Sequence, residues 1–229
     1  MPLLHAECKH FQALASPYHL FYPDHMAPFP LRFETLRGAA LMPHLPDLAG
    51  LRIAVFREWP YLYEGDEAYE ARYLRAYAEG EGAAVMLCRD GDRPVGISTC
   101  EPMGTTHQAV RACFLEAGLD PGRFCYFGES VLLQPYRGRG AGLRFFKLRE
   151  AHARSLGADY ATFCAVEREV DDPRRPAGYL PLDGFWQRRG YTPYPSLRCV
   201  MNWREPGGRA EIPHHLSFWI KPLSEASLP

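Results

Sequence analysis

The stretch with the clearest chemical meaning is QPYRGRGAG, residues 134–142, in which three glycines and two arginines follow an apolar run. A helix that begins there leaves its first backbone N–H groups without intrahelical partners. Glycines let a ligand approach the backbone closely because no Cβ intervenes. The helix dipole, together with Arg137 and Arg139, favours an anion. The stretch is therefore predicted to bind a phosphate, and a pyrophosphate fits it well.

Three phosphate-binding patterns compete for this stretch. A P-loop needs GxxxxGK[ST], and no lysine followed by Ser or Thr is present here. The dinucleotide fingerprint GxGxxG needs a third glycine where the chain has Leu143 or Phe145. The third pattern, [Gln/Arg]-x-x-Gly-x-[Gly/Ala], is met at every position by residues 137–142.

Through this third pattern the sequence resembles the GNAT (GCN5-related) acyl-CoA N-acyltransferases. LLQPYRGRGAG looks like the family's acyl-CoA signature, preceded by a strand and followed by an amphipathic helix. About 45 residues later, FWQRRGY (185–191) looks like its second motif. The DGD hairpin followed by PVGIS also matches the second and third strands of the family. The resemblance covers roughly residues 32–205.

The resemblance implies a mixed α/β fold, with a mostly antiparallel sheet that splays at its centre and is flanked by helices. It also implies acetyl-CoA as the acyl donor, with the pantetheine arm pairing like an added strand along 131–133. Amides from Arg137 to Gly142 would hold the pyrophosphate. The expected coenzyme-binding residues are Val131, Leu132, Leu133, Arg137, Gly138, Arg139, Gly140, Ala141, Gly142, Phe185 and Arg188.

Acyl transfer from a thioester to an amine needs a base for the amine, stabilisation of the oxyanion and, usefully, an acid for the thiolate. A backbone N–H near Leu132 or Leu133 would serve the oxyanion, so no metal is expected. Glu129 is the predicted base, because its apolar setting in YFGESVLL would raise the pKa of its carboxyl. The alternative for Glu129 is a carboxylate salt-bridged to a neighbouring strand.

The sequence does not single out one general acid for the departing thiolate. Many family members carry a tyrosine in the short helix of the second motif, where this chain has Trp186. Tyr191 and Tyr179 are the candidates taken here, and Tyr194 and Cys164 stay open, although each of these residues could simply pack in the core or a loop. The thiolate could also take its proton from water.

The acceptor is expected near the loop EWPYLYEGD, residues 58–66. Trp59, Tyr61 and Tyr63 could form an aromatic face, and Glu64, with the neighbouring Glu58 and Asp66, would add negative charge that suits an amine or another cation. The alternative is that these aromatics pack against the N-terminal arm.

The expected elements place these residues. Periodicity and turn residues predict strands at 32–36, 83–88, 94–100, 124–133, 160–166, 198–203 and 216–220, and helices at 45–59, 66–79, 105–117, 140–156 and 182–189. This order indicates a mostly antiparallel α/β sheet with parallel pairing near its middle. The domains are expected to be an N-terminal arm at 1–31 packed on the acetyltransferase domain at 32–205, and a C-terminal strand within 206–229 that completes the sheet.

Composition limits the partners. A net charge of -1 does not indicate a nucleic-acid binder. No apolar run approaches a membrane span, and no leader pattern is visible, so a cytoplasmic protein without a membrane partner is expected. The seven cysteines show no CxxC and are expected to be reduced and mostly buried. A homodimer through the last strands, Leu216–Ile220, is considered.

The expected function is an acetyl-CoA-dependent N-acetyltransferase that acts by direct transfer in a ternary complex on a small-molecule or peptide amine. A second hypothesis is a catalytically weak acyl-CoA-binding module, which the missing helix tyrosine supports. A third is a nucleotide-binding oxidoreductase, which would respond to NAD and not to coenzyme A.

Overall fold

The structure is a computed structural model that describes residues 30–224 and 227–229. The predicted arm at 1–31 therefore lies outside the described residues, except for Pro30 and Leu31.

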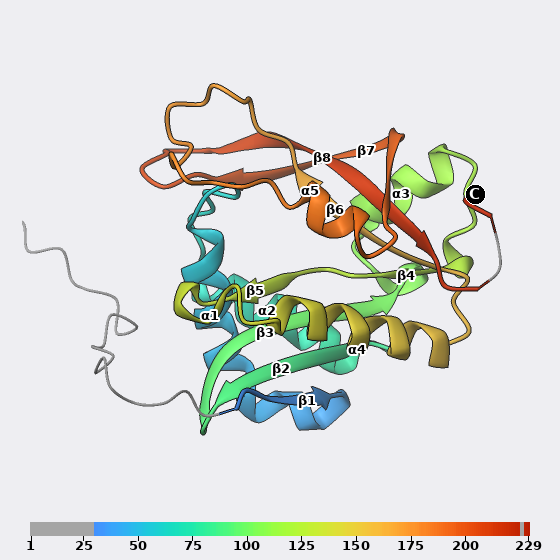
Figure 1. The fold of residues 1–229 in the computed structure, drawn as a ribbon, viewed down its shortest axis with the longest axis horizontal. Coiled ribbons are helices and arrows are strands. Elements are labelled where there is room, and N and C mark those ends of the chain that lie inside the picture. The colour runs from blue at the N-terminus through green and yellow to red at the C-terminus, as the bar shows by residue number, and fades with distance from the viewer. Residues whose placement is uncertain (1–29, 225–226) are drawn as a thin grey trace, which may run out of the picture.

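One eight-stranded sheet forms the centre of the molecule (Figure 1). Its order is β1-β2-β3-β4-β6-β8-β7, and β5 pairs with β3 off this path. Every pair is antiparallel except β4 with β6, which confirms the predicted sheet with parallel pairing near its middle. The strands are β1 (Arg32–Leu36), β2 (Ala84–Asp90), β3 (Arg93–Pro102), β4 (Phe124–Tyr126), β5 (Ser130–Leu132), β6 (Tyr160–Val166), β7 (Thr192–Arg204) and β8 (Glu211–Pro222).

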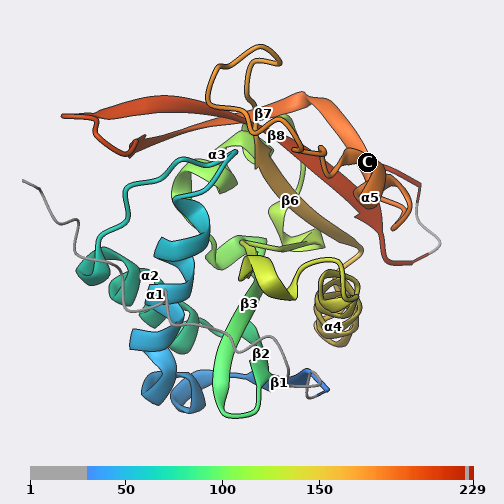
Figure 2. The ribbon, with the colours of Figure 1, turned by 60° about the vertical axis from the view of Figure 1, so that its left-hand side comes forward.

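Helices cover both faces of this sheet (Figure 2). They are α1 (Leu45–Phe56), α2 (Glu67–Glu79), α3 (Gln108–Glu116), α4 (Ala141–Ser155) and α5 (Asp183–Gln187). Side chains alternate along each strand, so β2 sends Val85 and Leu87 into the core under α1 and α2, and Met86 into the core under α4. Asp66 caps α2, since its carboxylate accepts the Tyr69 N–H at 2.8 Å.

The strand predicted at 124–133 is interrupted, and this is the main departure from the expected elements. β4 ends at Tyr126, β5 begins at Ser130, and Gly128 lies in the bulge between them. β4 pairs with both β3 and β6, whereas β5 pairs with β3 alone. The last backbone hydrogen bond across the centre of the sheet is donated by the Phe127 N–H to the Thr162 carbonyl, at 2.8 Å. Beyond it the two halves diverge, as Figure 1 shows, which confirms the predicted splay.

The C-terminal strands are longer than predicted. β8 lies between β6 and β7, so both backbone edges of Leu216–Ile220 are already paired within the chain. That segment therefore offers no free backbone edge to a second copy, and a homodimer through the last strands stays a prediction. The predicted boundary at 205 falls between β7 and β8, which form one continuous hairpin.

Two further observations concern the described residues. Their cysteines are unpaired, and all except the half-buried Cys113 are buried, as expected. No helix among them combines the length and the hydropathy that a membrane crossing needs.

Candidate active site

The glycine-rich stretch forms a turn of free amides at the start of α4. Gly138 and Gly140 have φ of 76° and 85°, values that glycine adopts without strain, and Gly140 caps the helix. Within the described residues, the N–H groups of 138–142 have no hydrogen-bond acceptor. A Cβ at Gly138 or Gly140 would meet no atom within 4 Å, so the turn is open to a ligand. The turn of free amides therefore lies at the positive end of a 15-residue helix, a position that favours an anion.

Arg137, predicted to bind the coenzyme, is engaged by contacts within the chain. Its N–H donates to the Gln134 carbonyl at 3.1 Å, because residues 134–136 form a short 3-10 turn. Its side chain turns away from the amides: Nε donates to the Leu132 carbonyl at 2.9 Å, and the guanidinium pairs with Glu58 at 2.8 Å. The amide set available for a diphosphate therefore begins at Gly138.

A cavity of about 540 Å³ adjoins this turn. Arg139, Gly140, Ala141 and Arg144 line one side of it, and the side next to β1 is lined by Pro30, Leu31 and Phe33. Three of these were predicted coenzyme-binding residues. Two arginines beside a cavity at a helix N-terminus indicate an anionic ligand.

The predicted second motif packs next to the same turn. The ring of Phe185 would lie 3.7 Å from a Cβ placed on Gly142, and it contacts the ring of Phe146 edge to face at 5.7 Å. Arg188 follows on the exposed side of α5. The structure therefore brings Phe185 to the turn, while Arg188 remains at the surface.

The edge of β5 that faces away from β3 pairs with no other strand. Leu133 N–H donates to the Val95 carbonyl and Thr99 N–H donates to the Glu129 carbonyl, both at 3.0 Å. Hydrogen-bonded and non-bonded pairs alternate in an antiparallel ladder, so the N–H and C=O of Leu132 point away from β3. Of the two predicted oxyanion donors, the Leu133 N–H is thus bonded to β3, whereas the Leu132 N–H is not. Val131 is buried with its side chain under α1 and pairs with Ile97.

Glu129, the predicted base, lies just before this edge. Its expected apolar surroundings are wrong: one carboxylate oxygen pairs with the Arg52 guanidinium at 2.5 Å and the other accepts the Tyr73 hydroxyl at 2.8 Å. Arg52 also binds Glu70. Burial would lower the pKa of Arg52, but the charges of Glu129 and Glu70 outweigh it and the pKa is raised. Arg52 therefore stays cationic beside Glu129. The alternative of a salt-bridged carboxylate is therefore met, although the partner comes from helix α1 and not from a neighbouring strand.

The acid candidates occupy different environments. Tyr191 is 1% exposed and packs in the core under α4, where its hydroxyl donates to Glu150 at 3.2 Å, which argues against a role at the reacting atoms. Tyr179 is half-buried, and its ring meets Trp59 edge to face at 6.0 Å. Burial, and then the charge of Asp183, raises the pKa of Tyr179, so its hydroxyl is protonated at neutral pH.

The other residues considered for the general acid also pack or form hydrogen bonds within the fold. Trp186 packs against Trp219 and Phe163, with ring centroids 5.1 Å apart in both cases. Tyr194 donates its hydroxyl to the Pro229 carbonyl at 2.9 Å. Cys164 is buried, with Sγ 3.2 Å from the Tyr126 hydroxyl.

The predicted acceptor loop is attached to the β7–β8 hairpin. The Tyr61 carbonyl accepts hydrogen bonds from Arg168 at 2.6 Å and from the Trp203 indole at 3.1 Å. Burial, followed by the charges of Cys164 and Glu129, raises the pKa of Tyr61. Tyr63 interacts with Glu70. The role of Trp59, Tyr61 and Tyr63 at an acceptor stays a prediction, and sequence reasoning missed Arg168, which holds this loop.

The negative charge of this loop is largely engaged. Glu64 pairs with Arg57 at 2.6 Å, Glu58 pairs with Arg137, and Asp66 caps α2. These carboxylates are therefore weaker attractants for a cationic acceptor than the sequence indicated, because each charge has a local partner.

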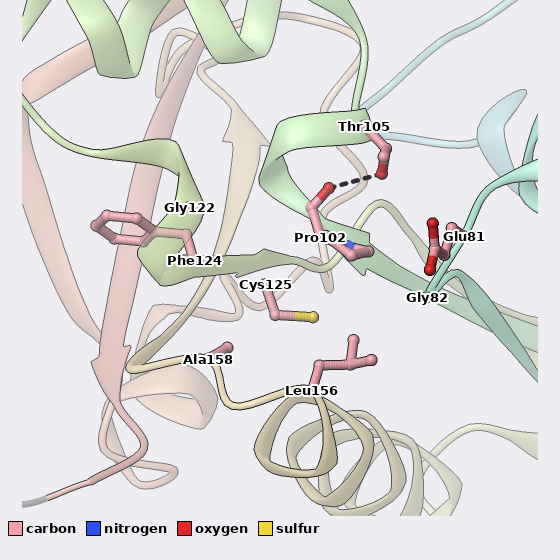
Figure 3. Close-up of a pocket in the computed structure, with 9 residues that line it drawn as sticks. All are labelled: Glu81, Gly82, Pro102, Thr105, Gly122, Phe124, Cys125, Leu156 and Ala158. Atoms are coloured by element: carbon pink, nitrogen blue, oxygen red, sulfur yellow. Dashed lines mark hydrogen bonds between the residues drawn. The ribbon is translucent and has the colours of Figure 1, made fainter.

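A second cavity, of about 310 Å³, lies at the far end of α4 (Figure 3). Leu156 and Cys125 approach it from α4 and β4, and Pro102 borders it from β3. None of the predicted site residues lines it. The candidate site is therefore the region from the glycine turn along β5 to the loop at 58–66.

No protein-family model matches the chain, and no curated protein matches it significantly. Solved structures do share its fold at low sequence identity. They include an acetyltransferase of the GNAT family from Streptococcus pneumoniae (TM-score 0.53, 11% identity, 84% of this chain and 99% of that one). A ribosomal-protein-alanine N-acetyltransferase from Brucella melitensis gives a TM-score of 0.55 at 14% identity, covering 85% of this chain and 99% of that one.

A third structure, from Salmonella typhimurium, is described as an acetyltransferase with its cofactor acetyl-CoA. It gives a TM-score of 0.54 at 12% identity and covers 88% of this chain and 98% of that one. The chain thus has the GNAT acetyltransferase fold that its two motifs predicted.

Proposed function

We propose that the protein is an N-acetyltransferase that moves an acetyl group from acetyl-CoA to an amine by direct transfer in a ternary complex. The observation that carries the proposal is the run of free amides at 138–142, which lies beyond the unpaired edge of β5. A diphosphate fits the first feature and an extended pantetheine arm fits the second. The solved structure of the same fold with acetyl-CoA supports this choice of ligand.

The chain's own groups supply the chemistry. The Leu132 N–H, turned away from β3, is the proposed donor to the oxyanion of the tetrahedral intermediate. Glu129 is the proposed base and accepts a proton from the amine nitrogen. The Arg52 guanidinium pairs with the same carboxylate and fixes its position just before β5. The departing thiolate takes its proton from water or from Tyr179.

The acceptor is proposed to enter beside Trp59, Tyr61 and Tyr63. Because the loop carboxylates are paired, aromatic contact rather than net charge is proposed to hold the acceptor. A small amine and a peptide amine both suit such a face.

The pairing of Glu129 with Arg52 favours one second candidate, an acyl-CoA-binding module with little turnover. The two functions make different predictions in one assay. Release of free coenzyme A thiol is followed over a panel of small amines and peptides, with acetyl-CoA as donor. The enzyme predicts thiol release that depends on the amine, whereas the binding module predicts a thermal shift with coenzyme A but no release. A thermal shift with NAD alone would contradict both.

A further inference from the structure

Ser130 is an exposed serine at the centre of the sheet. It begins β5, and its hydroxyl oxygen lies 3.0 Å from that of Ser98 on β3, which is 0% exposed. Strands that helices cover on both faces are mostly hydrophobic. Ser130 departs from this pattern because the pairing of β4 with β6 ends at Tyr126 and Thr162, so β5 pairs only with β3 in the described chain.

Ser130 and Glu129 lie on opposite faces of the sheet, as neighbours in a strand do. Glu129 contacts α1 and α2 through its carboxylate, which places it on the face that carries the loop at 58–66. Ser130 is paired with Ser98, and Ser98 is paired with Met86, which packs in the core under α4. The hydroxyl of Ser130 is therefore on the face of α4, whose first turn carries the free amides.

The proposed path of the pantetheine arm sets where its sulfur lies. The arm leaves the diphosphate at 138–142 and follows β5 back from Leu133, so its sulfur end falls near Ser130. Residues two apart on one face of a strand are about 6.6 Å apart. The Leu132 N–H and the Ser130 hydroxyl are thus spaced to contact the oxygen and the sulfur of one thioester.

A buried cation lies on the same face. Arg149 of α4 is 2% exposed, and its Nη1 donates at 3.2 Å to the Glu129 carbonyl, which belongs to the peptide group that joins Glu129 to Ser130. The guanidinium lies over the rings of Phe127 and Phe146, 4.4 and 4.7 Å from their centroids. Its Nε has no hydrogen-bond partner among the described residues.

The charge of Arg149 has no counter-ion in the part of the chain that the structure describes, since none of the ion pairs there includes it. The titratable groups that face it are Tyr191, Cys100 and the buried Cys125, with Glu129 across the sheet. Burial raises the pKa of Tyr191 and of Cys100 well above their usual values, so both are neutral. A buried cation without a carboxylate favours an anion on this face.

We propose that Ser130 is a catalytic residue whose hydroxyl, held by Ser98, donates a hydrogen bond to the departing sulfur of coenzyme A, while Arg149 supplies the positive charge that a thiolate needs. The proposal rests on the proposed function. When the C–S bond breaks, its electron pair goes to sulfur and Ser130 keeps its proton. The thiolate then takes a proton from water, and Glu129 returns the proton of the amine to the solvent. This arrangement replaces the missing helix tyrosine by a hydrogen bond and a charge.

The first test reads the bound thiol and needs no turnover. The ultraviolet absorbance of the coenzyme A thiolate is followed as the pH rises, each time against the same protein with desulfo-coenzyme A, so that the protein's own thiols and phenols cancel. Ser130→Ala should raise the pKa of the bound thiol by about one unit relative to wild type, a tenfold change in ionisation. Ser217→Ala, in β8 between β6 and β7, should leave it unchanged.

The outcomes of this titration separate the two proposals. Bound coenzyme A with the same thiol pKa in wild type and in Ser130→Ala would overturn the role of Ser130 alone. A wild-type protein that binds no coenzyme A would overturn both that role and the proposed function.

The second test reads the chemical step. The single-turnover rate of thiol release at saturating amine should fall about tenfold in Ser130→Ala, with KM for the amine changed by less than about twofold. Ser130→Thr keeps a hydroxyl and should recover most of the rate, whereas a serine that only packs would give no such recovery. Wild-type rates in Ser130→Ala, or equal losses in the alanine and threonine variants, would overturn the proposal. If wild type releases no thiol with any amine, the proposed enzyme function fails and the thiol titration still decides the role of Ser130.

Discussion

The guanidinium of Arg137 lies on the open edge of β5, where Nε donates to the Leu132 carbonyl oxygen at 2.9 Å. That oxygen is the acceptor that an added strand would use. The same guanidinium is held by Glu58 at 2.8 Å. Arg137 therefore occupies the proposed pantetheine position, and a bound coenzyme must share or displace its contacts.

Removing Glu58 should release Arg137 toward the coenzyme. Glu58→Gln is expected to lower KM for acetyl-CoA by about two- to fivefold, the size of an exposed ion pair. Steady-state kinetics measure it, with Glu64→Gln as the control because Glu64 pairs instead with Arg57. An unchanged or higher KM in Glu58→Gln would show that Arg137 does not limit access to β5.

Gly140 and Gly118 separate backbone strain from ligand binding. Both have positive φ, of 85° and 72°, and a Cβ at either would meet nothing within 4 Å. Alanine at either position should cost about 1 kcal/mol of unfolding free energy, because a Cβ is unfavourable in this region. Only Gly140→Ala should weaken coenzyme A binding, by roughly tenfold, since it distorts the amide turn. Equal affinities for the two variants in calorimetry would contradict the assignment of the turn.

Gly128 should be energetically coupled to Tyr77. Gly128→Ala brings a methyl group within 2.3 Å of the Tyr77 hydroxyl and should destabilise the protein by about 1–3 kcal/mol. In a Tyr77→Phe background the cost should fall, because the closest atom is gone. Urea unfolding of the two single variants and the double variant measures the coupling. Additive effects would mean that the hydroxyl does not lie against the bulge.

The raised pKa of Glu101 predicts a pH-dependent stability. A carboxyl whose pKa is higher in the folded state stabilises the fold fully below the unfolded pKa, about 4.3, and loses this contribution as the pH rises through the folded pKa. Glu101→Gln does not ionise, so its unfolding free energy should gain on wild type over that interval and then stay constant. Urea unfolding at several pH values checks this, with Glu79→Gln as control. A difference independent of pH would show that the pKa of Glu101 is not raised.

Local patterns predicted much of the fold because short-range physics determines them. The Asp66 cap, the DGD hairpin and the helix after Gly140 each depend on residues a few positions apart, and the structure has all three. The break at Gly128 could not be predicted in the same way. It depends on hydroxyls from α2 that approach the strand from about 50 residues away in the chain.

The same distinction applies to the candidate site. The amide turn follows from the order of glycines at 138–142, so the sequence indicated it directly. The surroundings of Glu129 do not follow from the local sequence, since Arg52 and Tyr73 reach it from two helices. Tyr69, Tyr73 and Tyr77 are spaced by four in the sequence, which indicates one helix face, and this is the available signal for the contact of Tyr73 with Glu129. Glu101 belongs to no motif, and its burial is visible only in the structure.

Calorimetric titration of coenzyme A and of pantetheine into the protein tests the central claim most directly, because the two ligands share the arm and differ in the diphosphate nucleotide. The amide turn at the start of α4 predicts measurable heat with coenzyme A and binding at least about tenfold weaker with pantetheine, a loss of 1.4 kcal/mol or more. No heat with coenzyme A, or equal affinity for both ligands, would contradict the account.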